Sequence, residues 1–268
     1  RFVVDGEQLD GRAAERVRSV VDHVRSLADG VQDCPVRLES ENSFPTNVGL
    51  GSSASGFAAA ATALSAAADL ELTHPEISTI ARRGSASAAR AVTGGYSDLH
   101  TGLNDVDCRS ERIDTGLEDV RIVAALVPAY KETEAAHEEA ADSHMFDARL
   151  AHVHAQLAEM RDALRAGEFD RAFRIAEHDT LSLAATTMTG PAGWVYWKPA
   201  TLKVFEAVRN LREEGVPAYF SVDTGASVYV NTTEEHVDIV ESAVAETGVE
   251  TRRWEVGGPA RVVDDHLF

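Results

Sequence analysis

The pattern of apolar and polar residues at the start of the chain predicts two strands with a helix between them. Residues 1–4 and 36–41 alternate in the manner of half-buried strands. Residues 14–27 repeat their apolar side chains with the helical period, which predicts an amphipathic helix. This order of elements is typical of a domain that mixes helices with a sheet.

A helical region follows these elements. Residues 57–68 are rich in alanine and almost free of charge, so we expect a helix that is buried on nearly every side. Residues 74–83 are predicted to form a second helix, which Gly84 stops. Ser85 is placed to cap a short third helix that runs through Val92 and ends at two glycines.

The second half of the chain predicts one strand, several helices, two strands, a helix and a last strand. The first strand covers residues 120–127. The helix after it has apolar residues at intervals of four and three, namely Phe146, Leu150, Val153, Leu157, Met160 and Leu164. The remaining helices are expected at residues 169–185, 201–214 and 234–246, and the remaining strands at 218–222, 227–230 and 249–256. This order is that of a ferredoxin-like domain.

The two patterns together predict an α+β protein of two domains. The N-terminal α+β domain is expected over residues 1–118, and the ferredoxin-like C-terminal domain over residues 119–268. The sequence contains no run of 18 uninterrupted apolar residues, so it predicts no membrane span. Cys34 and Cys108 are too few for a disulfide scaffold or a zinc site of four thiolates. We therefore expect a cytoplasmic protein.

The charge balance narrows the classes of partner. Asp and Glu number 44 against 25 Lys and Arg, which gives a net charge of -19. Such a surface argues against binding nucleic acid or an anionic membrane through bulk electrostatics. Only three of the basic residues are lysines, Lys131, Lys198 and Lys203. An acidic, lysine-poor composition favours a halophilic protein, because dense carboxylates hold hydrated cations while salt screens their repulsion; an ordinary acidic cytosolic protein is the alternative.

The segment from Pro45 to Gly56 carries the strongest chemical signal. It has three glycines and three serines between a predicted strand and a predicted helix. Glycines let the backbone approach a ligand, and a helix start offers unpaired N–H groups, so the segment predicts a phosphate-binding loop. It is not a Walker A loop, because no Gly-Lys-Ser/Thr follows. A tight turn with a serine cap is the alternative.

This loop resembles that of the GHMP kinase superfamily of small-molecule kinases. The matching residues are Pro45, Gly49, Leu50, Gly51, Ser52, Ser53 and Ala54, and the wider stretch from Ser40 to Ala58 is similar to the mevalonate diphosphate decarboxylase branch. Three later stretches agree with that branch: Ala81 to Arg90 with Gly94-Gly95, Lys131 followed by Ser143 and Arg149, and Tyr219 to Ala226. The resemblance implies the two-domain GHMP-type fold, a homodimer, and ATP with Mg²⁺ as cofactors.

The sequence departs from the branch at three places. The N-terminal domain is expected to lack the family's first strand region, which carries Asn, Tyr and Lys residues. After Lys131, the family's Ser-Ser-x-x-Gly-Met is replaced by Glu134 to Glu139, and Gly225 is followed by Ala-Ser where Pro-Asn is usual. These departures bear on whether the substrate is the 5-monophosphate or the 5-diphosphate of mevalonate.

The implied reaction moves the γ-phosphate of ATP to a tertiary hydroxyl and then loses phosphate and carbon dioxide. Such a site needs a base or orienting group for the hydroxyl, a cation for the carboxylate and donors for the phosphates. By resemblance Asp223 is the catalytic aspartate, Arg90 holds the substrate carboxylate, and Lys131 neutralises the transferred phosphate. A turn-forming aspartate, a surface arginine and a solvated loop lysine are the respective alternatives.

The same resemblance assigns the phosphate contacts. Gly49, Gly51, Ser52, Ser53 and Ala54 are expected to bind the phosphates of ATP, with a Mg²⁺ contact as a further role of Ser53. Ser85 and Ser87, together with Ser143 and Arg149, are expected to bind the substrate, although Ser85 is also read as a plain helix cap.

The function we predict is ATP-dependent decarboxylation of 5-phosphomevalonate to isopentenyl phosphate, in isoprenoid biosynthesis. The alternatives are the same reaction on 5-diphosphomevalonate, a mevalonate-type kinase that stops at the phosphorylated product, and a metabolite-binding protein without catalysis. Release of carbon dioxide separates the decarboxylases from a kinase, and formation of ADP separates all three enzymes from a binding protein.

Overall fold

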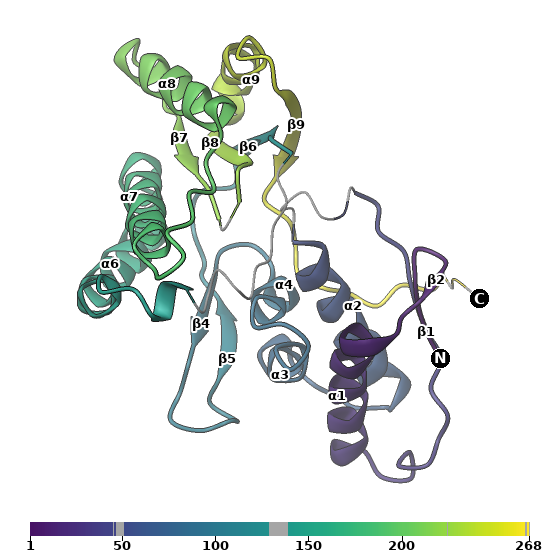
Figure 1. The fold of residues 1–268 in the computed structure, drawn as a ribbon. Coiled ribbons are helices and arrows are strands. Elements are labelled where there is room, and N and C mark those ends of the chain that lie inside the picture. The colour runs from purple at the N-terminus through teal and green to yellow at the C-terminus, as the bar shows by residue number, and fades with distance from the viewer. Residues whose placement is uncertain (45, 47–50, 129–138, 224, 266, 268) are drawn as a thin grey trace. The chain divides into compact units, whose positions relative to one another are not determined.

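The computed structural model describes residues 1–44, 46, 51–128, 139–223, 225–265 and 267 (Figure 1). The chain forms two compact units. Unit 1 comprises Arg1–Ile113 and Gly257–Phe268, and unit 2 comprises Asp114–Val256. The last segment joins unit 1 through backbone hydrogen bonds, from Ala260 N to Val92 O (3.0 Å) and from Gly95 N to Gly257 O (2.8 Å). Two separate domains divided near residue 118 stay a prediction.

Unit 1 contains a small sheet with the order β2-β1-β3 and a hairpin of β4 and β5. The strands are β1 (Phe2–Val4), β2 (Glu7–Gln8), β3 (Leu38–Ser40), β4 (Ser97–His100) and β5 (Arg109–Arg112). The helices are α1 (Gly11–Leu27), α2 (Ser52–Ala67), α3 (His74–Ala81) and α4 (Ala88–Thr93). α1 lies between β1 and β3 in the chain, as the apolar pattern predicts, and the two strands pair in parallel. Apolar side chains of the four helices form the core of this unit.

Two details of unit 1 differ from the sequence predictions. Helix α2 is not buried on nearly every side, because Ala59, Ala63 and Ala66 are exposed. Because an alanine side chain has little apolar surface to bury, an alanine-rich helix can expose one side to solvent at a small cost in free energy. The short third helix begins at Ala88, and its capping position is Ser87, not Ser85.

Unit 2 is a four-stranded antiparallel sheet with the order β7-β8-β6-β9. Its strands are β6 (Val120–Leu126), β7 (Tyr219–Ser221), β8 (Val228–Thr233) and β9 (Glu250–Glu255). Its helices are α6 (Phe146–Ala166), α7 (Phe169–Met188), α8 (Pro199–Glu213) and α9 (Val237–Ala245), with a 3-10 turn at Glu234–His236 before α9. The order of strands and helices confirms the ferredoxin-like prediction, and α6 and α7 are additions to it before α8.

The core of unit 2 lies between the sheet and helices α8 and α9. Phe220 of β7 stacks on Phe205 of α8, with ring centroids 4.0 Å apart. Helix α6 has the predicted extent, yet Leu150 and Leu157 of its apolar stripe are 45% and 43% exposed. Among the described residues, no helix is long and apolar enough to cross a membrane.

Candidate functional site

The start of α2 has the geometry expected of a phosphate-binding loop. Gly51 precedes the helix with φ 76°, a left-handed conformation that a side chain would strain. The first intrahelical bond runs from Ser55 N to Gly51 O (3.0 Å), so the amides of Ser52, Ser53 and Ala54 have no partner within the helix. These amides and the positive end of the helix dipole suit an anion. Gly49 lies outside the described residues.

A cavity of about 490 Å³ opens beside this helix start. Its walls come from the β1–β2 turn, β3, α1 and α2, and they include Ser52, Ser53 and Gly56. At the wall, Asn42 donates to Asp5 through its backbone N (2.7 Å) and its side-chain amide (2.8 Å). These two hydrogen bonds lower the pKa of Asp5 from its usual value. The cavity wall therefore combines apolar and polar side chains, among them the hydrogen-bonded carboxylate of Asp5, and it includes residues of the helix start whose amides have no partner within the helix.

Arg16 of α1 is a candidate that the sequence analysis missed. Its Nε donates to Gly84 O (2.6 Å), its Nη2 donates to Ser53 Oγ (3.2 Å), and its guanidinium lies 4.8 Å from the centre of the Phe57 ring. Arg16 thus joins the phosphate-loop helix to the segment that begins the Gly-Ser-x-Ser motif. Its position on an amphipathic helix carries no local signal of this role, because both partners are distant in the sequence.

The substrate-binding residues predicted in unit 1 lie on and before α4. Ser85 and Ser87 are half-buried, and their hydroxyl oxygens are 3.1 Å apart. Arg90 follows on α4 and is exposed, whereas its neighbours Ala88 and Ala89 are fully buried. Burial of these two alanines holds the short helix against the core and leaves the serine pair and the arginine at the surface of the unit.

In unit 2 the predicted catalytic aspartate lies just beyond strand β7. Asp223 is exposed, whereas Val222 before it and Ala226 after it are buried. Tyr229 of β8 lies opposite Ser221 in the strand pairing. Burial raises the pKa of Tyr229 to about 12, and the charge of Asp223 adds to this effect. The tyrosine is therefore a neutral phenol near neutral pH, and it lies within electrostatic reach of the aspartate.

The other predicted residues of unit 2 have partners inside the unit. The buried Ser143 hydroxyl lies 2.7 Å from Thr189 Oγ1 and accepts from Met145 N (3.1 Å). Arg149 of α6 forms an ion pair with Asp179 of α7 (2.9 Å) and donates to Ser182 Oγ (2.9 Å). These contacts connect α6 and the segment before it with α7 and the residue after it. A role in substrate binding stays a prediction for Ser143 and for Arg149.

Two further predictions concern Lys131 and the binding of a metal ion. Lys131 lies outside the described residues, as does the acidic stretch after it up to His137 and Glu138. Among the side chains that the structure describes, no group of three or more His, Cys, Asp or Glu residues is arranged to hold a metal ion.

Comparison with known proteins places these features in one family. Residues 1–110 match the model of the diphosphomevalonate decarboxylase-like N-terminal domain. Over 266 residues the chain is 71% identical to the phosphomevalonate decarboxylase of Haloferax volcanii, an alignment that covers 98% of this chain and 82% of the relative.

Solved structures agree with the fold of the described residues. The mevalonate diphosphate decarboxylase from Staphylococcus aureus is similar with a TM-score of 0.88 and 24% identity, over 96% of this chain and 80% of that one. A structure of MDDEF in complex with MVAPP, AMPPCP and magnesium is similar with a TM-score of 0.84 and 27% identity, over the same shares of the two chains. The chain therefore belongs to the mevalonate diphosphate decarboxylase family, the branch of the GHMP kinase superfamily that its phosphate-loop motif resembles.

Proposed function

We propose that this protein is an ATP-dependent decarboxylase that converts 5-phosphomevalonate to isopentenyl phosphate. The observation that carries the proposal is the 71% identity, over nearly the whole chain, to a phosphomevalonate decarboxylase. The amides at the start of α2, which have no partner within the helix, and the exposed Asp223 would supply two of the three kinds of group that this chemistry requires, namely donors for the phosphates and a base.

The reaction needs phosphorylation because hydroxide is a poor leaving group. Transfer of the γ-phosphate of ATP to the C3 oxygen turns that oxygen into a phosphate ester. When the C3–O bond then breaks, the electrons of the bond between C2 and the carboxylate carbon form the C2–C3 double bond. Phosphate and carbon dioxide leave together with ADP as products. The protein's task is to position the groups and to stabilise charge.

Unit 1 would hold the phosphates of ATP. The amides of Ser52, Ser53 and Ala54 lie at the start of α2, and Gly51 in its left-handed conformation lets the backbone approach a phosphate. A phosphate contact of Gly49 stays a prediction from the family. Arg16 lies beside Ser53 and would add a positive charge next to the phosphate chain. Mg²⁺, when bound, would neutralise phosphate charge, and the Ser53 hydroxyl would be its contact from this chain.

The resemblance to the family assigns the groups that would act on the substrate. Asp223 would accept or orient the proton of the C3 hydroxyl, and Tyr229 beside it would remain neutral. Arg90 would hold the C1 carboxylate with its planar guanidinium. Ser85 and Ser87 would donate to the 5-phosphate, and Lys131 would neutralise the transferred phosphate. Substrate contacts of Ser143 and Arg149, like a homodimer, remain predictions from the family.

The test is a coupled ADP assay with mevalonate, its 5-phosphate and its 5-diphosphate in parallel, at molar KCl, with carbon dioxide measured in the same reactions. We expect kcat/KM for the 5-phosphate to exceed that for the diphosphate by at least ~10-fold, about 1.4 kcal/mol of transition-state binding. Comparable or reversed values would assign the protein to the diphosphate. ADP without carbon dioxide would indicate a kinase, and no ADP with any of the three compounds would indicate a binding protein.

The same assay with Asp223→Asn tests the site. The variant keeps the shape of the side chain and removes its negative charge. Release of ADP and of carbon dioxide should fall together by ~10²–10⁴, the usual range for a general base, because phosphorylation comes first. Near-full ADP production by the variant would make Asp223 a turn residue.

A further inference from the structure

Strand β7, which leads to Asp223, is an edge strand whose outer backbone groups are covered. Among the residues that the structure describes, β7 pairs with β8 alone, and no strand lies on its other side. Helices α7 and α8 lie along this side (Figure 1). Buried N–H and C=O groups need partners, and here side chains of the helices replace the missing strand.

A partly buried ion pair holds the backbone at the start of β7. Glu177 of α7 is 7% exposed and accepts two hydrogen bonds from Arg212 of α8, at 2.6 and 2.9 Å. Glu177 Oε2 also accepts from Phe220 N (3.0 Å), and Arg212 donates to Ala218 O (3.1 Å). The carboxylate and guanidinium therefore satisfy two outward groups of β7.

The second half is held by a single hydroxyl. Thr180 lies one helical turn after Glu177 on α7 and is 6% exposed. Its Oγ1 is 3.3 Å from both Val222 N, which donates to it, and Val222 O, which accepts from it. One side chain thus fixes the peptide groups on both sides of Val222, and the next residue is Asp223.

The far end of the loop is fixed in a similar way. Thr201 of α8 is fully buried and donates to Ala226 O (2.7 Å). The Ser227 hydroxyl accepts from Val127 N (3.2 Å) at the end of β6. The loop is therefore held at Val222 and at Ala226, while the side chain of Asp223 between them is exposed.

We propose that Thr180 is a positioning residue for Asp223. Its hydroxyl fixes the peptide plane from which the Asp223 backbone leaves the strand, and so the direction of the carboxylate. The proposal rests on the catalytic role proposed for Asp223. A displacement of about 1 Å at a reacting group costs as much as ~10²-fold in rate, so a hydroxyl that touches no substrate can control turnover.

The experiment compares Thr180→Val with Thr187→Val in the decarboxylase assay. Thr187 is a matched control on the same helix, since it is 2% exposed and its hydroxyl donates to carbonyls of α7 itself, Leu183 O and Ala184 O. We expect Thr180→Val to lower kcat by about 10- to 100-fold and to leave KM for ATP and for the substrate within about twofold. Thr187→Val should keep both parameters.

A second pair of variants distinguishes the loss of the hydrogen bonds from a loss of folding. Thr180→Ser and Thr180→Ala both lack the γ-methyl and differ only in the hydroxyl oxygen, so activity retained by Ser and lost by Ala assigns the effect to the hydrogen bonds. Equal kcat values for Ser and Ala, with both folded, would overturn the proposal. A rise of KM in place of a fall in kcat would also overturn it, because the effect would then lie in binding.

The double variant Thr180→Val with Asp223→Asn separates this proposal from the one on which it rests. If Thr180 acts through Asp223, the double variant should be no slower than Asp223→Asn alone. Multiplicative losses would mean that Thr180 acts elsewhere. A slow Asp223→Asn with an unaffected Thr180→Val would overturn the positioning role alone. Full turnover of Asp223→Asn would overturn both proposals.

Discussion

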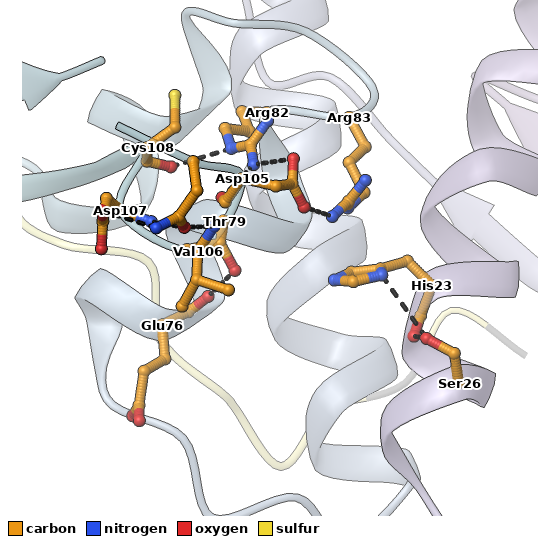
Figure 2. Close-up of polar contacts among 11 residues, drawn as sticks. His23, Ser26, Glu76, Thr79, Arg82, Arg83, Asp105, Val106, Asp107 and Cys108 are labelled. Atoms are coloured by element: carbon orange, nitrogen blue, oxygen red, sulfur yellow. Dashed lines mark hydrogen bonds and ion pairs between the residues drawn. The ribbon is translucent and has the colours of Figure 1, made fainter. Parts of the chain in front are cut away.

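His23 illustrates at the scale of a residue how a neighbourhood sets a protonation state. It projects from α1 beside Ser26, and Asp105 across from it bridges Arg82 and Arg83 (Figure 2). Burial lowers the pKa of His23, Arg83 and Arg82 lower it further, and Asp105 opposes them. The folded protein therefore favours the neutral imidazole more than the unfolded chain does.

This preference predicts how stability responds to mild acid. A histidine whose pKa is lowered by folding stabilises the protein above about pH 6.5, its unfolded value, and that contribution is lost as the pH falls through the folded pKa. The urea concentration at the midpoint of unfolding should therefore fall less between pH 7 and pH 5 for His23→Gln than for the wild-type protein. His152→Gln, at an exposed position on α6, is the control and should follow the wild type. Parallel declines for His23→Gln and wild type would contradict the prediction.

At the scale of elements, small residues decide how the helices of unit 1 approach one another. Ala61 of α2, Ala81 of α3 and Ala88 of α4 are completely buried. Gly84, between α3 and α4, has no room for a methyl group, because a Cβ there would lie 2.0 Å from Cδ1 of Phe57. The Phe57 ring is itself 9% exposed and packed in the core.

Gly84→Ala should therefore destabilise unit 1 through overpacking, by about 1–3 kcal/mol in the free energy of unfolding. Gly56→Ala is the matched comparison, since Gly56 lies within α2 and nothing is within 4 Å of the Cβ it would gain. This second change should stabilise the protein by about 0.5–1 kcal/mol, because alanine is the better helix former. Urea unfolding followed by circular dichroism measures both. Equal stability of the two variants would show that Phe57 moves aside without cost.

At the scale of the whole molecule, the dominant feature is the charge of -19. Several arginines meet carboxylates in ion pairs, among them Arg121 with Glu234 and Arg253 with Asp238 and Glu241. Acidic residues still far outnumber basic ones, so the net repulsion among carboxylates opposes the folded state.

Salt should therefore stabilise the protein. The Debye length falls from ~10 Å at 0.1 M to ~3 Å at 1 M, which screens repulsion between exposed carboxylates. We expect the melting temperature to rise steadily from 0.1 to 2 M KCl, and differential scanning fluorimetry over that range measures it. A melting temperature that is flat or falls would contradict the halophilic interpretation of the composition.

Much of the fold and of the site could be predicted from the sequence by itself. The apolar periods predicted the long helices and most of the strands, but not β2 or the hairpin of β4 and β5. The order of elements over the second half predicted the ferredoxin-like sheet. The glycine and serine pattern before α2 determined the family, and it predicted the helix start at which Gly51 adopts a left-handed conformation. These signals are local, because a period or a turn residue acts through its own neighbours in the chain.

Only the tertiary structure decided which distant side chains complete these elements. Arg16 meets Ser53 and Gly84, 37 and 68 residues away, and Thr180 meets Val222, 42 residues away. The start of α4 at Ala88 and the solvent-exposed side of α2 likewise depend on which other elements pack against these helices. A hydroxyl or guanidinium has the same local signature whether it faces solvent or a backbone group of another element, so these contacts exist only once the chain has folded.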